Sequence, residues 1–241
     1  MSYQSSSEEQ MWALKEFLAK TWKIIVAIIV IGLLAYYGWS YYQSNQVKKS
    51  DETSTRYSQL LTQLDESKSD SVKELVDFAK QNNNIYGVFA DLQSAKFYVD
   101  VLKDYAGAQS LLTDALTKTK SEPLQSIIHI RIARLQYQQG QYKESFESLD
   151  KVTGNAWIPY VNDVRGDVYV KLERYAEAVD AYNVALSSPS MVGSKENIKM
   201  KLNQAEYLKA KQSTETEKKS ADHEAEQGTQ LKKAEAEENK N

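Results

Sequence analysis

The sequence predicts an all-α protein in which a single N-terminal transmembrane helix is followed by a solenoid of helical hairpins. Three observations predict this fold class. An uncharged, strongly apolar run lies near the N-terminus. Helix-forming Ala, Leu, Gln, Lys and Glu are abundant, whereas the 241 residues include only three prolines and nine glycines, a composition that favours helix. A weak internal repeat recurs in the second half of the chain, at a period typical of stacked helical pairs.

The first element is a transmembrane helix over residues 21–42. No charged side chain occurs from residue 24 to residue 47, and roughly 20 apolar residues of helix cross a hydrocarbon core about 30 Å thick. Bulky residues follow the run where a cleaved signal peptide would have small ones, so we expect the helix to remain as an anchor. The alternative is a buried core helix, which is rarely apolar on all sides. Aromatic residues typical of membrane interfaces flank the run: Trp12, Phe17, Trp22, Tyr36, Tyr37, Trp39, Tyr41 and Tyr42.

Residues 1–20 form a short head before the anchor. Apolar residues recur at helical spacing in its second half, which predicts either an amphipathic helix on the membrane surface or a frayed extension of the anchor helix. Basic residues lie on both sides of the anchor, so the positive-inside rule does not decide its orientation. A short head in front of a large C-terminal domain favours a cytosolic N-terminus.

A further helix is expected after a polar break at residues 65–70. Ser71 and Glu74 have the spacing of a capping box, in which the hydroxyl and the carboxylate each bond a free backbone N–H at a helix start. From Asn84 onward the sequence predicts three helical pairs and a closing helix. The pairs are 86–101 with 106–119, 121–138 with 142–152, and 155–172 with 175–186, and the closing helix covers 195–211.

An internal repeat supports this division into pairs. Residues 141–150 align with residues 174–183 at an offset of 33, and a looser copy at 104–116 lies 37 residues before the first of them. A helix-turn-helix unit at such a period indicates a tetratricopeptide-like domain, which we place at residues 43–211.

The last repeat shows the packing that this architecture requires. We expect the small residues Gly166 and Ala178 to let the paired helices approach closely. Tyr169 and Tyr182 would fill the space beside them. Pro189 would end the second helix of the pair, because proline cannot continue a helix.

Residues 212–241 are predicted to be a disordered charged tail. Leu231 is the only large aliphatic residue in this segment, so the segment cannot bury enough apolar surface to fold alone. Its Ala, Glu and Lys content favours no more than transient helix.

No set of residues suggests catalysis, a metal site or a cofactor. The chain has no cysteine, and its two histidines, His129 and His223, lie in an apolar stretch and in the tail. A zinc site needs more ligands, and a nucleophile needs a base beside it. Glycine-rich phosphate-binding loops are missing. A net charge of −3 offers no basic surplus for nucleic acid. We therefore expect a protein that is not an enzyme and uses no cofactor.

A helical solenoid offers a concave surface lined by the first helix of each pair. With Gly166 as the small position of its repeat, the residues expected to face this groove are Arg134, Tyr137, Tyr160, Asp163 and Asp167. Such a mixed polar and aromatic lining would suit an extended segment or a partner helix. The alternative is that the arginines Arg131 and Arg134 pair with these aspartates across the stack. Trp157 is expected to pack rather than to contact a partner.

Several short motifs follow the anchor in a set order. They are Gly38-Trp39, Asn84-Ile85-Tyr86-Gly87, Leu124-Gln125, Arg131-Ile132-Ala133-Arg134-Leu135, Asn155-Ala156-Trp157 and Asp163-Val164-Arg165-Gly166-Asp167. Their order and spacing resemble those of the YfgM-type ancillary subunits of the bacterial Sec translocon, over residues 8–210. The charged tail departs from that family.

The resemblance implies a single-pass protein of the inner membrane with a cytosolic N-terminus and periplasmic repeats. It implies association with SecYEG and with the membrane-anchored chaperone PpiD, where the protein would help to pass emerging polypeptides to periplasmic chaperones. It also implies restraint of the stress-response regulator RcsB from the cytosolic side. Two other classes remain open: an anchored scaffold for envelope assembly or cell division, and a regulator whose active part is residues 1–20.

Overall fold

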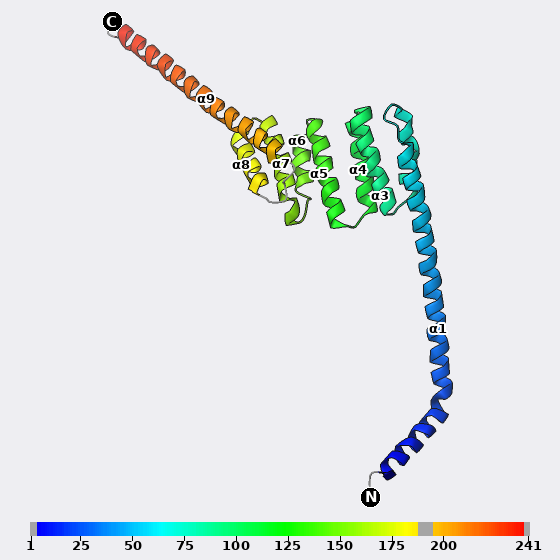
Figure 1. Cartoon of the computed structure of the whole chain (residues 1–241). Coiled ribbons are helices and arrows are strands. Elements are labelled where there is room, and N and C mark those ends of the chain that lie inside the picture. Colours follow the sequence, from blue (N-terminus) through cyan, green and yellow to red (C-terminus); the bar gives the residue numbers. More distant parts are fainter. Residues whose placement is uncertain (1–3, 188–194, 239–241) are drawn as a thin grey trace. The chain divides into compact units, whose positions relative to one another are not determined.

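The computed structural model describes residues 4–187 and 195–238, and the described residues contain helices and no strand. The all-α prediction is therefore confirmed. The chain divides into two compact units, residues 1–62 and residues 63–241, which we describe separately (Figure 1).

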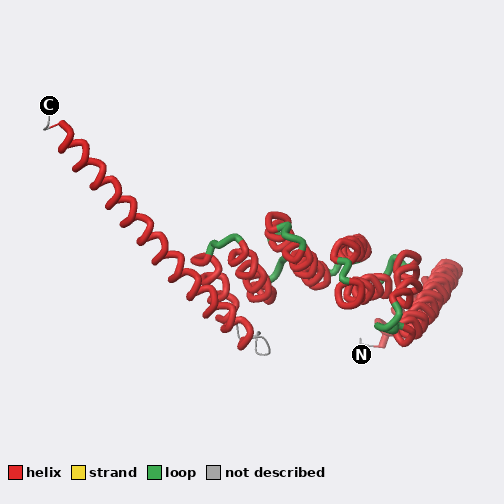
Figure 2. Tube along the Cα trace, turned by 90° about the horizontal axis from the view of Figure 1, so that it is seen from above, coloured by secondary structure: helices red, strands yellow, loops and turns green. Residues whose placement is uncertain are grey.

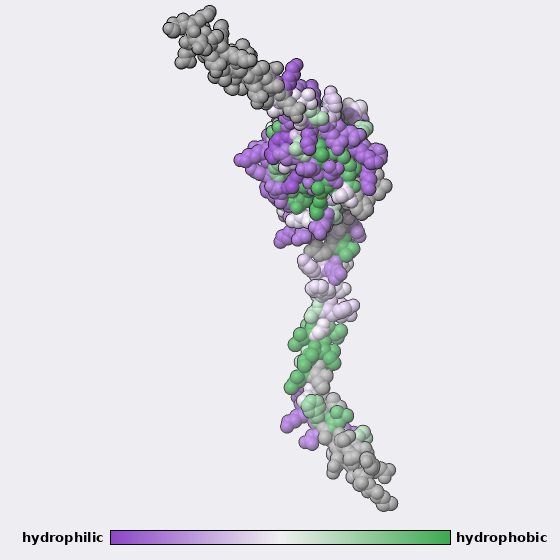
Figure 3. All heavy atoms as spheres, turned by 90° about the vertical axis from the view of Figure 1, so that its left-hand side faces the viewer, coloured by the Kyte–Doolittle hydropathy of each residue, from purple (hydrophilic) through white to green (hydrophobic). Residues whose placement is uncertain are grey.

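The first unit is made of one long helix, α1 (Gln4–Gln63). Head, anchor and the segment after it thus form one continuous helix, and no proline before residue 123 interrupts it. The apolar side chains point outward: Ile24, Ile31 and Leu34 expose 61%, 66% and 68% of their surface. Figure 3 shows a band of hydrophobic residues along this helix. Such exposure does not fit a core helix of a soluble protein.

Among the described residues, one stretch is long and apolar enough to cross a membrane, Val26–Gln63. None of its apolar window is buried. Apolar side chains without a protein partner need a hydrocarbon environment, so the unit fits a single transmembrane helix.

The second unit is a series of helices that pack in sequence order (Figures 1 and 2). α3 packs on α4, α5 on α6, and α7 on α8, as predicted, and α9 closes the series against α8 and α7. The elements are η1 (Ser69–Val72), α2 (Lys73–Gln81), α3 (Ile85–Phe97) with the π-helical turn η2 (Tyr98–Leu102), α4 (Tyr105–Lys118), α5 (Glu122–Gln138), α6 (Tyr142–Leu149), η3 (Asn155–Trp157), α7 (Ile158–Lys171), α8 (Tyr175–Ser187) and α9 (Lys195–Glu238).

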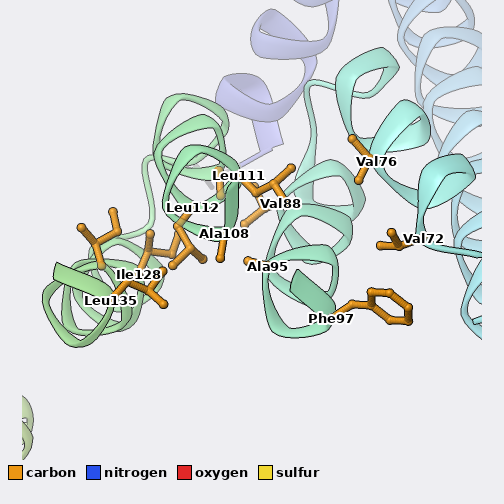
Figure 4. Close-up of a cluster of buried hydrophobic side chains, with 12 residues drawn as sticks. Val72, Val76, Val88, Ala95, Phe97, Ala108, Leu111, Leu112, Ile128 and Leu135 are labelled. Atoms are coloured by element: carbon orange, nitrogen blue, oxygen red, sulfur yellow. The ribbon is translucent and has the colours of Figure 1, made fainter. Parts of the chain in front are cut away.

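One hydrophobic cluster joins α2 through α5 (Figure 4). Val88 and Ala95 of α3 meet Leu111 and Leu112 of α4, and Ile128 of α5 completes the cluster. Since each pair of helices buries its apolar side against its neighbour, stacking gives a continuous core that no pair could form alone.

A buried ion pair fixes the first helical pair to α2. Lys118 Nζ lies 2.6 Å from Asp91 Oδ2 and donates a hydrogen bond of 2.8 Å to the carbonyl oxygen of Ala79. The two charged side chains expose only 10% and 2% of their surface. Burial raises the pKa of the Asp91 carboxyl, and the Lys118 ammonium opposes this rise. One ammonium group therefore connects α2, α3 and α4.

The close approach predicted at Gly166 is confirmed. A methyl group on Gly166 would lie 2.6 Å from Cδ1 of Tyr182, so no larger residue fits without a shift of the ring. Ala178 and Tyr182 of α8 are buried in the cluster between α7, α8 and α9, and Tyr169 packs against it. Pro189, expected to end α8, lies outside the described residues.

The predicted capping box at Ser71 is wrong. The Ser71 hydroxyl donates to the carbonyl oxygens of Asp65 and Lys68 and accepts from the backbone N–H of Asp65. It therefore stabilises the preceding turn, and Ser71 lies inside the short helix η1. A cap that the sequence reasoning missed is Asn84, whose side chain accepts hydrogen bonds from the N–H groups of Tyr86 and Gly87 at the start of α3.

The expectation of a disordered tail from residue 212 differs from the structure. α9 continues as one helix to Glu238. The physical reason is local: this segment has no proline and is rich in Ala, Glu, Lys and Gln, all strong helix formers. Lack of burial argues against a packed fold, but it does not prevent helix.

Candidate interaction surface

The five residues predicted to line a groove lie on two neighbouring inner helices. Arg134 and Tyr137 are on α5, and Tyr160, Asp163 and Asp167 are on α7. Their exposure differs widely, since Arg134 is half-exposed whereas Asp163 is 8% exposed. The structure brings the charged members together, whereas Tyr160 packs against Trp157.

The charged side chains alternate in sign from α5 through α7 to α9. Arg134 Nη2 lies 3.4 Å from Asp163 Oδ2. On the other side, Lys201 Nζ of α9 lies 2.8 Å from Asp163 Oδ1 and 2.7 Å from Asp167 Oδ2. The Tyr182 hydroxyl donates to Asp167 Oδ1 at 2.7 Å. We call these five residues the inner charge network. The interhelical pairing proposed for Arg134 is therefore observed, whereas Arg131 reaches neither aspartate.

The pKa shifts in the inner charge network follow from burial and from these contacts. Burial disfavours the charged form of Lys201, but its hydrogen bonds to Asp163 and Asp167 outweigh this, so the pKa of Lys201 is raised. Burial and the Asp167 charge raise the pKa of Tyr182 far above its ordinary value, so the hydroxyl remains a donor. Burial, together with the Asp167 charge, also raises the pKa of Tyr137. Lys201 was missed from the sequence, which placed it only on a closing helix.

The aromatic members of the predicted set have packing partners. Tyr160 is half-buried, with its ring centroid 5.8 Å from that of Trp157, and it contacts the clusters on both sides of α7. Tyr137 lies 6.2 Å, centroid to centroid, from Tyr142 of α6. Trp157 packs as expected against a cluster that includes Val161 and Val164.

A groove that the sequence reasoning missed lies between the inner helices α3 and α5. It has a volume of about 360 Å³. Its walls come from α3 and η2 on one side and from α5 on the other, with Leu112 of α4 contributing to the apolar surface. Apart from Arg134, none of its lining residues belongs to the predicted set.

A metal site would need several of the acidic and histidine side chains of the described residues to lie close together. No cluster of three or more His, Asp or Glu side chains in that part of the chain could hold a metal ion. His129 is half-buried on α5, and its pKa is lowered by burial and by the charge of Lys151. What the surface does offer is an apolar groove next to a row of paired charges.

Comparison with known proteins covers most of the chain. Residues 15–207 match a family model described as a tetratricopeptide repeat-like domain. The chain is 30% identical to the ancillary SecYEG translocon subunit of Escherichia coli (strain K12) over 203 residues, which cover 84% of this chain and 98% of that protein. It is 31% identical to the protein of the same name from Aggregatibacter actinomycetemcomitans over 70% of this chain and 82% of the relative. The protein of the same name from Haemophilus influenzae is 27% identical over 84% of this chain and 99% of the relative. No solved structure matches.

Proposed function

Because the chain belongs to the family of ancillary SecYEG translocon subunits, with tetratricopeptide repeat-like domains, we propose that it is a membrane-anchored, non-enzymatic scaffold associated with SecYEG. One observation carries the proposal: the similarity to the E. coli relative extends over 98% of that protein's length. The alignment is thus long enough to include both the apolar helix and the repeats.

The proposed location is the inner membrane, with the N-terminus in the cytosol and residues 43–211 in the periplasm. The exposed apolar band of α1 supports an anchor, and the small size of residues 1–20 supports a head that stays in the cytosol. In this arrangement the repeats would receive emerging polypeptides and help to transfer them to periplasmic chaperones such as PpiD. Residues 1–20 would be the part available to restrain RcsB in the cytosol.

The inner surface supports a binding role better than a chemical one. Its acidic side chains Asp163 and Asp167 are held by Lys201, and Tyr182 stays protonated because its pKa is raised. These groups are held in place by one another, which suits a rigid surface that recognises a polypeptide. The residues proposed to face the partner are Arg134, Tyr137, Tyr160, Asp163 and Asp167.

Topology can be tested with an accessible tag at each terminus of the full-length protein in spheroplasts. The C-terminal tag should be digested by added protease and the N-terminal tag should be protected. Protection of the C-terminal tag in intact spheroplasts, with digestion after lysis, would place the repeats in the cytosol and refute the periplasmic role.

Partner identity can be tested with a photo-crosslinking residue at Arg134, which is 51% exposed. The expected products contain SecYEG, PpiD or a secreted chain. A crosslinker at Lys143 of α6, which is 86% exposed and outside the inner charge network, is the matched control and should give fewer of these products. Capture of division or outer-membrane assembly proteins in place of SecYEG would favour the alternative, an anchored envelope scaffold.

A further inference from the structure

The groove between α3 and α5 combines an apolar floor with a charged rim. Its apolar lining consists of Leu92, Ala95, Val99, Leu112 and Leu135, and its rim consists of Lys96, Asp100, Arg131 and Arg134. Figure 4 shows that Ala95, Leu112 and Leu135 come from three different helices, α3, α4 and α5. A volume of about 360 Å³ accommodates a few side chains of a bound segment.

The charges on the rim are not balanced. Asp100 is the only acidic residue among the lining, and it pairs with Lys96 at 3.5 Å on its own helical segment. Arg134 turns toward Asp163 on α7. Arg131 forms no ion pair with any acidic residue that the structure describes, and burial together with the neighbouring charge of Arg134 lowers its pKa. The positive end of the rim therefore lacks a counter-charge within the described chain.

These features define the chemistry of an occupant. A guanidinium group binds a carboxylate through two parallel hydrogen bonds, and the pair is stronger where water is partly excluded. The exposed part of the apolar floor, from Leu92 and Val99, gains from contact with aliphatic side chains and from the release of water. An inorganic anion would satisfy Arg131 but would leave the floor in contact with water. A peptide with a carboxylate and aliphatic side chains would pair with Arg131 and also cover the apolar floor.

We propose that the groove between α3 and α5 binds an extended segment of a partner protein in which one carboxylate, held by Arg131, is flanked by aliphatic side chains. The proposal deepens the scaffold function proposed above, because it names the chemical class of segment that the scaffold recognises. It adds a contact on the first two helical pairs to the surface proposed above, and Arg134 belongs to both.

The test uses the full-length protein in non-ionic detergent micelles and two fluorescein-labelled peptides. One has a single aspartate between two pairs of leucines, and the other has asparagine in its place. Fluorescence anisotropy gives the affinities, with empty micelles as the blank. We expect the aspartate peptide to bind about tenfold more tightly, because its carboxylate can form charge-assisted hydrogen bonds with Arg131 in a groove that is partly open to water.

Variants separate the carboxylate contact from the apolar one. Arg131→Gln should abolish the preference for aspartate, and Arg131→Lys, which keeps the charge but loses the planar fork, should restore part of it. Val99→Ser should weaken both peptides equally, because it alters only the floor. Lys143→Gln makes the same charge change on α6, outside the groove, and should leave both affinities unchanged. Circular dichroism verifies that each variant keeps its helices.

Equal affinity for the two peptides, or a preference that survives Arg131→Gln, would overturn the proposal. The same holds if phosphate ion at millimolar concentration displaces the peptide completely, because the site would then be a simple anion site. These outcomes are independent of the partner test. Capture of SecYEG at Arg134 without peptide binding would leave the scaffold function standing, and carboxylate-dependent binding without SecYEG capture would remove the translocon role alone.

Discussion

The two ends of the inner surface carry similar side chains but use them differently. Around α7, the carboxylates of Asp163 and Asp167 are both held by Lys201, and Asp163 also faces Arg134. Around α3 and α5, the groove is open and Arg131 has no acidic partner among the described residues. The difference shows that charge on a helical repeat can serve stability at one end while it remains available to a partner at the other.

The helices around the groove between α3 and α5 should nevertheless be firmly folded, and Asp91→Ala tests this. The change leaves the buried Lys118 ammonium without its counter-charge, and loss of one member of a buried pair typically costs about 3–5 kcal/mol. We expect the free energy of unfolding, measured by urea denaturation in mild detergent, to fall by about this amount. Asp77→Ala, which removes an aspartate that is 66% exposed on α2, should change it by less than about 0.5 kcal/mol. If Asp91→Ala lowered the free energy of unfolding by less than about 1 kcal/mol, the helices around this groove would be loosely packed.

Around α7, Gly166→Ala should lower the free energy of unfolding by about 1–3 kcal/mol. The added methyl group would overlap the ring of Tyr182, and overpacking of this kind outweighs the better helix propensity of alanine. The measurement is the same urea titration. A double variant with Tyr182→Leu is the control, since a smaller side chain makes room for the methyl group and the two effects should then be clearly non-additive. If the free-energy changes of the two substitutions simply added, the close contact between Gly166 and Tyr182 would be contradicted.

These two contacts also show what a sequence can reveal. Gly166 and Tyr182 were predictable because their spacing follows the repeat, and the pairing of Arg134 with Asp163 was foreseen as an alternative because the two residues have related positions in consecutive repeats. Asp91 and Lys118 were not recognised, because burial of a charged residue depends on how two helices rotate against each other. Lys201 was missed for a related reason: α9 follows no repeat motif, so periodicity does not define which side chains face α7.

The errors near the ends of the domain have local causes. Ser71 has the correct spacing to Glu74 for a capping box, but its hydroxyl bonds Asp65 and Lys68 in the preceding turn instead. Residues 212–241 can bury little apolar surface, which predicts disorder, but they are strong helix formers and α9 extends through them to Glu238. The groove between α3 and α5 could not be found from periodicity, because its floor combines residues from three helices.

A smaller loss of stability is expected for Lys201→Met, which removes the ion pairs with Asp163 and Asp167. The lysine side chain is 26% exposed, so loss of its two ion pairs should cost about 1–2 kcal/mol, less than the change at Asp91. Because the pKa of Lys201 is raised in the folded state, this stabilisation should be complete below the ordinary lysine pKa of about 10.4 and should decline as the pH rises through the raised value. The difference between the wild type and the variant should therefore shrink at strongly alkaline pH. Lys199→Met, on the exposed side of α9, is the control and should show neither effect.

The smallest effect on stability is expected for Arg131→Gln. Arg131 has no ion pair within the described chain, and burial together with the like charge of Arg134 lowers its pKa. Its removal should therefore change the free energy of unfolding by less than about 0.5 kcal/mol. Arg134→Gln, which breaks a half-exposed pair with Asp163, should cost up to about 1 kcal/mol. If Arg131→Gln destabilised the protein by more than Arg134→Gln, then Arg131 would be a structural residue, and the two ends of the inner surface would not differ in the way proposed. If the fold does not need Arg131, its position in a groove with an apolar floor is best explained by a binding partner.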